Sequence, residues 1–169
     1  MKIRFSLGAL ALLLLLATIS RAQAPVTAHY LNVGQAESIL LEFKSAAILI
    51  DAGGEDTGDN RDADHILGYL NAFYERRTDL REKTGQRRGI LYSVIISHPH
   101  IDHTRHLMAV MENFKVLNLV EGGQKGTSIG LKPLNKARAF VRANHILYNV
   151  RNLNTEQMWV ITRKHRSGC

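Results

Sequence analysis

Apolar positions along the chain follow two periods, an alternating one typical of strands and a wider one typical of helices. Three short runs rich in β-branched and aliphatic residues come first, and they predict strands over Val26–Val33, Ser38–Phe43 and Ala46–Asp51. The two-residue connection Lys44-Ser45 predicts a hairpin between the second and third runs. Ala46–Ile50 is almost continuously apolar, which is typical of a strand covered on both faces.

Helical spacing then alternates with further strand-like runs. A helix is predicted to begin between Asp62 and His65, with His65 on its surface and Ile66, Leu67, Leu70, Phe73 and Tyr74 on its apolar face. Thr104 is predicted to cap a second helix, and Leu134–Leu147 predicts a third amphipathic segment. Strands are predicted over Ile90–Ile96, Lys115–Glu121 and Met158–Thr162. Strands interleaved with helices indicate an α/β fold.

The first 24 residues have the pattern of a secretory signal peptide. A basic start at Lys2 and Arg4 precedes an apolar core, and Ala22-Gln23-Ala24 resembles a small-residue cleavage site. The alternative is a membrane anchor, but the apolar run is shorter than the roughly 20 residues that a span requires. We therefore expect an exported protein, periplasmic or extracellular, with no stable membrane anchor after cleavage.

Composition and charge say little about which molecules the protein binds. The formal net charge is +7, and a basic stretch runs through Arg76–Arg88. That stretch is interrupted by acidic residues and has no interleaved aromatic residues for base stacking, so a charged connecting loop is favoured over a nucleic-acid groove. The chain has one cysteine, Cys169, which excludes an intramolecular disulfide.

The candidate chemistry is concentrated in Ser97–His103, which follows an apolar run directly. In an extended chain His98, His100 and Asp102 would point to one side, and Pro99 would favour that conformation at His98. His103 would approach from a second direction, where the chain turns into a helix. Imidazoles with a carboxylate suit zinc, with iron or manganese as alternatives, and one or two ions are expected. The competing interpretation is a histidine-rich surface loop or a pair of hydrogen-bonded core histidines.

These residues resemble the signature His-x-His-x-Asp-His of the metallo-β-lactamase superfamily. The flanking segments Tyr30–Leu41 and Ile48–Gly54 resemble the branch found in ComEC-type DNA-uptake competence proteins, and the resemblance covers about residues 26–120. It implies an αββα sandwich, a mixed sheet with flanking helices, of which this chain would carry the first half.

The resemblance also implies roles for individual residues. His98 and His100 would bind a first metal, and Asp102 and His103 a second. Asp51 would lie beside the metals as a supporting group, with a strand-terminating turn as the alternative interpretation.

The later part of the chain departs from the family pattern. No aspartate follows Asp102, so the expected bridging carboxylate is missing, and only His145 and His165 remain as weak candidates for late ligands. His145 is predicted on an amphipathic helix, and His165 lies among basic residues. Residues 25–169 are therefore expected to form one such domain, truncated or diverged after about residue 121. His106, just after the motif, is expected to be partly exposed on a helix.

The activity that the resemblance implies is hydrolysis by metal-bound hydroxide. The expected target is a phosphodiester or another ester or amide-type bond, with nucleic acid as one possible substrate and Asp102 orienting the nucleophile. The missing aspartate favours an alternative, a noncatalytic metal-binding or interaction domain. Hydrolysis of β-lactams is a further alternative that rests only on the shared motif and on export.

Overall fold

The computed structural model describes residues 25–55 and 63–151. Several predicted features lie outside these residues: the signal peptide at 1–24, the strand Met158–Thr162, His165 and Cys169.

A six-stranded mixed sheet forms the centre of the molecule, with the strand order β1-β2-β3-β5-β7-β8. The first three strands, β1 (Thr27–Tyr30), β2 (Ile39–Glu42) and β3 (Ala47–Ile50), pair antiparallel. From β3 onward the pairing is parallel through β5 (Ser93–Ile95), β7 (Asn118–Glu121) and β8 (Leu147–Val150). The predicted α/β class and the first three predicted strands are confirmed.

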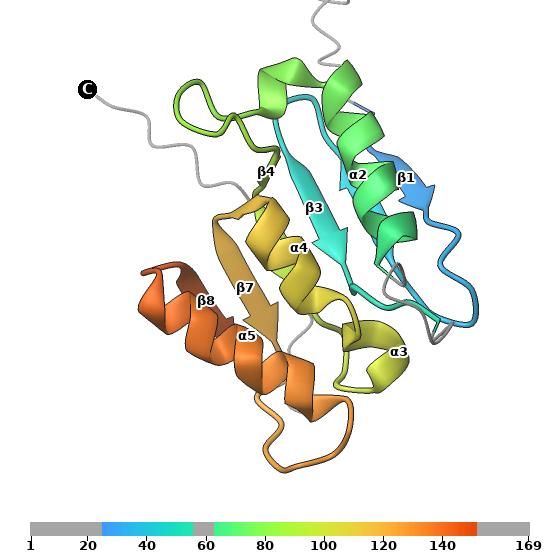
Figure 1. Cartoon of the computed structure of the whole chain (residues 1–169), viewed down its shortest axis with the longest axis vertical. Coiled ribbons are helices and arrows are strands. Elements are labelled where there is room, and N and C mark those ends of the chain that lie inside the picture. The colour runs from blue at the N-terminus through green and yellow to red at the C-terminus, as the bar shows by residue number, and fades with distance from the viewer. Residues whose placement is uncertain (1–24, 56–62, 152–169) are drawn as a thin grey trace, which may run out of the picture.

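Helices cover one face of this sheet. Figure 1 shows α2 (Asp64–Arg76), α4 (Leu107–Asn113) and α5 (Leu131–Ala143) in front of the strands, with the short α3 (Ile101–Thr104) below α4 and beside one end of α5. A 3-10 turn, η1 (Thr78–Leu80), follows α2. The predicted helix from about Asp62 is confirmed with its apolar face inward, and His65 is exposed as expected.

The core lies between the helices and the strands. Side chains that point from the strands toward the helices are fully buried, among them Leu40, Leu49, Val94 and Leu119. They meet the buried faces of the three long helices, including Ile66, Phe73, Leu107, Leu134 and Val141. Burying each large aliphatic side chain contributes roughly 1.5–3 kcal/mol, so this layer holds the helices to the sheet.

The opposite face of the sheet is less covered. Its strands place aliphatic side chains there that are only half-buried: Ile39, Leu41, Ile48, Ile50, Ile95 and Val120. A sheet with helices on one face and an aliphatic surface on the other matches part of an αββα sandwich.

Two predicted strands are each divided in two. Ile90–Ile96 contains β4 (Ile90–Leu91) and β5, and Lys115–Glu121 contains β6 (Lys115–Val116) and β7. β4 and β6 pair parallel in a separate two-stranded sheet. The chain moves between the two sheets at Tyr92 and Leu117, which are 58% and 36% exposed, and the prediction of continuous strands was wrong at these positions.

The predicted amphipathic segment Leu134–Leu147 was wrong at its carboxyl end. α5 ends at Ala143, and β8 begins at Leu147. His145 lies in the turn between them with a φ of 54° and is exposed, so it is not on a helix.

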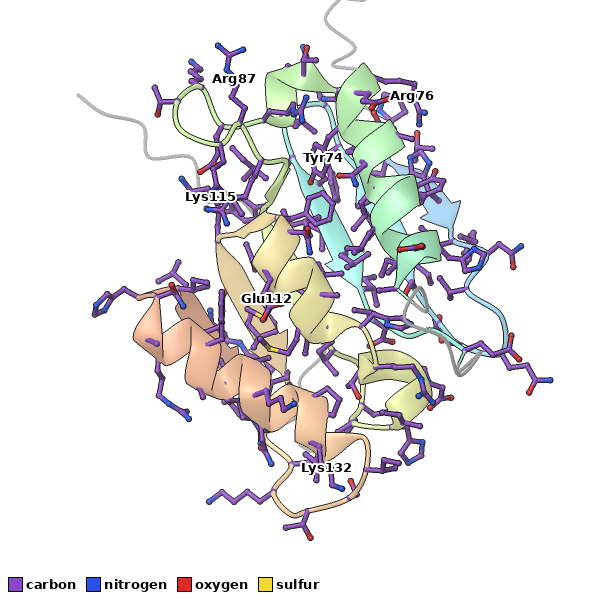
Figure 2. All side chains as sticks on the ribbon, viewed as in Figure 1. Tyr74, Arg76, Arg87, Glu112, Lys115 and Lys132 are labelled. Atoms are coloured by element: carbon purple, nitrogen blue, oxygen red, sulfur yellow. The ribbon has the colours of Figure 1, made fainter. Side chains whose placement is uncertain are left out.

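The basic stretch is a connecting segment, as predicted. It joins α2 to β4, and several of its charges are paired within the fold: Arg77 with Glu42 and Asp79, and Glu82 with both Arg88 and Lys115. In Figure 2, Arg76 and Arg87 lie at the end of the molecule away from α3. Within residues 25–55 and 63–151, the helices are too short and too polar to cross a membrane.

Candidate metal centre

The histidine motif lies where parallel strands end. β3 leads into Asp51 and β5 leads through Ile96 into Ser97, so both segments emerge at the same edge of the sheet. Residues at the carboxyl ends of neighbouring parallel strands come close together, and such crevices are where α/β proteins commonly place ligands.

The motif is extended only in its first half. His100 has β-region dihedral angles (φ −88°, ψ 154°), and α3 begins at the next residue. Asp102 therefore lies in the first turn of a helix, and the prediction that it alternates with His98 and His100 along an extended chain was wrong. The helix instead brings Asp102 and His103 together.

Of the three motif histidines, His98 contacts both of the others. His98 Nε2 lies 3.2 Å from His100 Nδ1. The rings of His98 and His103 have centroids 4.0 Å apart. His103 Nε2 is 3.5 Å from Asp102 Oδ2, and Asp102 is about half exposed, so the cluster opens to solvent on that side.

Asp51 contacts this cluster from the buried side. It is completely buried and has a φ of 57°, a left-handed conformation that aspartate and asparagine adopt more readily than other non-glycine residues. Its Oδ1 accepts a hydrogen bond from Ser97 N–H at 2.8 Å, and its Oδ2 accepts one from Ser97 Oγ–H at 2.6 Å. Oδ2 also lies 2.8 Å from His103 Nδ1. A carboxylate that accepts the Nδ1 proton of a histidine leaves Nε2 able to bind a metal.

Glu37 is a further carboxylate beside the motif, and no spacing pattern indicates it. Its Oε2 lies 4.0 Å from His103 Nδ1, and its side chain is half exposed. Donor atoms of Glu37, Asp51 and His103 all lie within 4.8 Å of one another, a spacing that could hold a metal ion. Asp51 already accepts hydrogen bonds on both oxygens. The side chain of Glu37 therefore has fewer contacts within the protein than that of Asp51.

Close backbone packing fixes the two segments against each other. A side chain at Gly53 would collide with the backbone carbonyl of Asp102, and Ala52 N–H donates to the carbonyl of His103 at 2.9 Å. Only glycine allows this approach. The motif and the turn after β3 are thus one packed unit.

Two predictions about residues after the motif were wrong. Thr104 does not cap α4; its hydroxyl hydrogen-bonds the carbonyl oxygens of His100, at 3.0 Å, and Gly130, at 2.8 Å, which joins α3 to the start of α5. His106 is 5% exposed rather than partly exposed, and its ring packs against Gly54.

The late part of the described chain adds no ligand to the cluster. His145 is exposed in the turn after α5, and nothing brings it to the motif. Glu121, at the end of β7, is buried and bonded to Arg138, Tyr148 and the Gly123 N–H. Burial alone would raise the pKa of Glu121, but these hydrogen bonds together hold it below its ordinary value of 4.5. This carboxylate is therefore engaged in holding β7, α5 and β8 together.

A shallow hollow of about 280 Å³ adjoins the motif. It is lined by Pro99–Asp102 and by Ser128, Ile129 and Gly130 ahead of α5. Ile129 is 66% exposed at its edge. A substrate group could lie here beside His100 and Asp102.

The donor set fits a divalent metal. Two nitrogens bound at about 2.05 Å to a tetrahedral zinc lie about 3.3 Å apart, close to the 3.2 Å between His98 Nε2 and His100 Nδ1. His98 lies close to both His100 and His103, Asp102 lies close to His103, and Asp51 is bonded to His103. That these residues bind a metal stays a prediction.

Comparison with known protein families gives one match. A family model described as the metallo-beta-lactamase superfamily matches residues 31–140, well over half of the chain. No curated protein matches the sequence.

Proposed function

Because the chain belongs to the metallo-beta-lactamase superfamily, we propose that it is a metal-dependent hydrolase whose centre is built on His98, His100, Asp102 and His103. The observation that carries this proposal is the approach of His98 Nε2 and His100 Nδ1 to 3.2 Å, a separation suited to two ligands of one ion. Zinc suits this donor set best, with iron or manganese as alternatives. When bound, such an ion activates water as a nucleophile and stabilises the negative charge that develops on the substrate.

The protein residues have distinct tasks in this proposal. Asp51 orients His103 through Nδ1, so that Nε2 is presented on the side of Asp102. Asp102 is half exposed and acts as the catalytic carboxylate, because it can orient an attacking water and accept its proton. Thr104 fixes α3 to Gly130 and so holds the hollow beside His100 in shape.

A phosphodiester is the substrate that we favour, with other ester or amide-type bonds as alternatives. Support comes from the resemblance to ComEC-type proteins and from the positive net charge. The cation nearest the motif in sequence is Arg105, whose Nε donates to the Gly54 carbonyl at 3.0 Å. A guanidinium at this position suits an anionic substrate. The paired basic stretch after α2 lies away from α3 and is not part of this argument.

A noncatalytic metal-binding or interaction domain is a second candidate. The observation that favours it is the absence of any aspartate after Asp102 in the sequence. A centre with too few ligands could bind an ion without efficient turnover.

The first experiment is metal analysis of the purified protein. We expect one or two zinc ions per chain, lost in the double variant His98→Ala, His100→Ala, together with metal-dependent hydrolysis of bis-p-nitrophenyl phosphate. Bound metal without turnover would favour the noncatalytic candidate. Turnover of a chromogenic lactam instead would favour a β-lactam hydrolase, and a folded protein that binds no added zinc would refute the metal centre.

We also propose that the protein is exported to the periplasm or the extracellular space, because residues 1–24 have the pattern of a signal peptide. Sequencing the amino terminus of protein recovered from expressing cells tests this. Cleavage after Ala24 is expected, and an intact terminus on protein that stays in the cytoplasm would refute it.

A further inference from the structure

We propose that Glu37 is a second carboxylate ligand of the metal centre, and that the loop before β2 replaces the acidic ligand that the chain lacks after Asp102. This inference rests on the proposed metal centre. It starts from the position of Glu37, which no spacing within the histidine motif would reveal.

The backbone of Glu37 is fixed to both segments that build the centre. Glu37 N–H donates to the carbonyl of Asp102 at 3.1 Å, and Gly53 N–H donates to the carbonyl of Glu37 at 3.0 Å. The turn that brings the chain back toward the motif passes through Gly34, which has a φ of +76° and therefore suits glycine. Glu37 is thus held between the motif and the turn after β3, although it lies far from both in sequence.

The side chain of Glu37 lies beside the cluster without being bonded to His103. The 4.0 Å between Glu37 Oε2 and His103 Nδ1 is longer than a hydrogen bond. Glu37 lies on the Nδ1 side of His103, so binding an ion held by Nε2 requires its carboxylate to turn toward Asp102. Because the side chain is half exposed, this movement has little desolvation cost. Asp51 lacks this freedom, because it is buried and accepts hydrogen bonds on both oxygens.

Charge gives a physical reason for a second carboxylate. Three neutral imidazoles and Asp102 bring one negative charge to a divalent ion, and Glu37 would bring the second. Two other glutamates lie elsewhere: Glu121 is bonded to Arg138 and Tyr148, and Figure 2 shows Glu112 on α4, apart from α3. A hard, anionic oxygen ligand also suits zinc or manganese beside imidazoles.

The test measures metal binding rather than activity. Zinc affinity is determined by competition with a chromogenic chelator for the full chain and for Glu37→Gln, which keeps the shape of the side chain and removes its charge. Glu112→Gln, at an exposed position on α4, is the matched control. We expect Glu37→Gln to weaken zinc binding at least tenfold and the control to change it less than twofold. The visible absorption spectrum of the cobalt-loaded protein should change in Glu37→Gln alone, since a ligand oxygen is lost.

Each outcome separates this inference from the function on which it rests. If zinc affinity and the cobalt spectrum are unchanged in Glu37→Gln while His98→Ala, His100→Ala abolishes binding, the centre exists without Glu37 and the inference is overturned. If the unaltered protein binds no metal, both fail. In Glu37→Ala, added acetate should restore part of the lost affinity, because a small carboxylate can enter from solvent; restoration supports a ligand role, and weakened binding with no restoration contradicts it.

Discussion

Replacing Asp51 by asparagine tests how the centre is organised, because it changes the chemistry of this position with little change of shape. Asparagine also tolerates the left-handed φ of 57°, so the backbone need not move. The carboxylate now lies against three donors, Ser97 N–H, Ser97 Oγ–H and the His103 ring. In Asp51→Asn one oxygen becomes an amide NH₂, which donates and can no longer accept.

The structure allows the size of the effect to be estimated. The hydrogen bond from Ser97 N–H to Oδ1 changes from charged to neutral and loses about 1 kcal/mol. The bond from Ser97 Oγ–H to Oδ2 must reverse, with the new amide NH₂ donating to Oγ, at a similar cost, so we expect the free energy of unfolding to fall by roughly 2 kcal/mol. The amide NH₂ facing His103 Nδ1 favours the tautomer with its proton on Nε2, the nitrogen on the side of Asp102. A proton there opposes metal binding, and loss of such an orienting contact typically weakens metal affinity about 10–100-fold.

Two measurements check this prediction. Urea unfolding followed by circular dichroism, in the presence of a chelator, gives the stability of the metal-free protein, and chelator competition gives zinc affinity. Asp79→Asn is the control, since Asp79 pairs with Arg77 at an exposed site and should contribute less than about 1 kcal/mol. Wild-type zinc affinity in Asp51→Asn would refute the orientation of His103 by Asp51. Asp51→Ala is less informative, because losing all three hydrogen bonds and placing alanine at a left-handed φ could cost about 5 kcal/mol or more, comparable with the stability of a whole domain.

Three further predictions concern other parts of the molecule. Gly53→Ala should lower zinc affinity at least tenfold, because its methyl group would collide with the Asp102 carbonyl. The control is Gly68→Ala in the open middle of α2, which should raise the free energy of unfolding by about 0.5–1 kcal/mol. Equal zinc affinities in the two variants would contradict the close packing at Gly53. The lowered pKa of Glu121 stabilises the fold above about pH 4.5, and this contribution is lost as the pH falls through the folded-state pKa. Acid unfolding curves of wild type and Glu121→Gln should therefore converge at low pH. A constant difference in stability down to pH 2 would refute this role of Glu121. Leu119→Ala removes a fully buried side chain from β7 and should cost about 2–5 kcal/mol in urea unfolding, and a loss below 1 kcal/mol would show that the sheet is not packed as described.

The sequence alone predicted the elements whose periodicity is uninterrupted. β3 and α2 each have one buried face throughout, so their apolar positions were readable in the sequence. β1 was predicted from its residue types although it is largely exposed. The division of the run around Tyr92 was not predictable from the pattern. Ile90–Ile96 stays strand-like while the chain passes from one sheet to another, and hydrophobicity does not record which sheet a residue joins. β8 was missed because helical spacing in α5 continued into it across His145.

The residues of the candidate site were likewise only partly predictable from the sequence. His98, His100, Asp102 and His103 are close in sequence, so spacing alone suggested a metal site. Asp51 was predicted only through the family resemblance. Its contact with His103 depends on the parallel pairing of β3 with β5, which local spacing does not reveal. Glu37 had no local signal, because it reaches the motif through a backbone hydrogen bond to Asp102 that only the folded chain creates.

The backbone contacts around Gly53 have a consequence for the order of events during folding. Ala52 and Gly53 meet the motif helix, and Thr104 is bonded to Gly130, so this geometry of the centre requires the turn after β3, the motif and the start of α5 to be folded together. A nascent chain that has emerged only as far as the histidines cannot hold a metal in this geometry. Metal would then bind the finished structure and draw the folding equilibrium toward it, adding about 2.7 kcal/mol at an ion concentration 100 times the Kd. If the proposed centre binds metal, metal supply would thereby affect how much of the protein is folded.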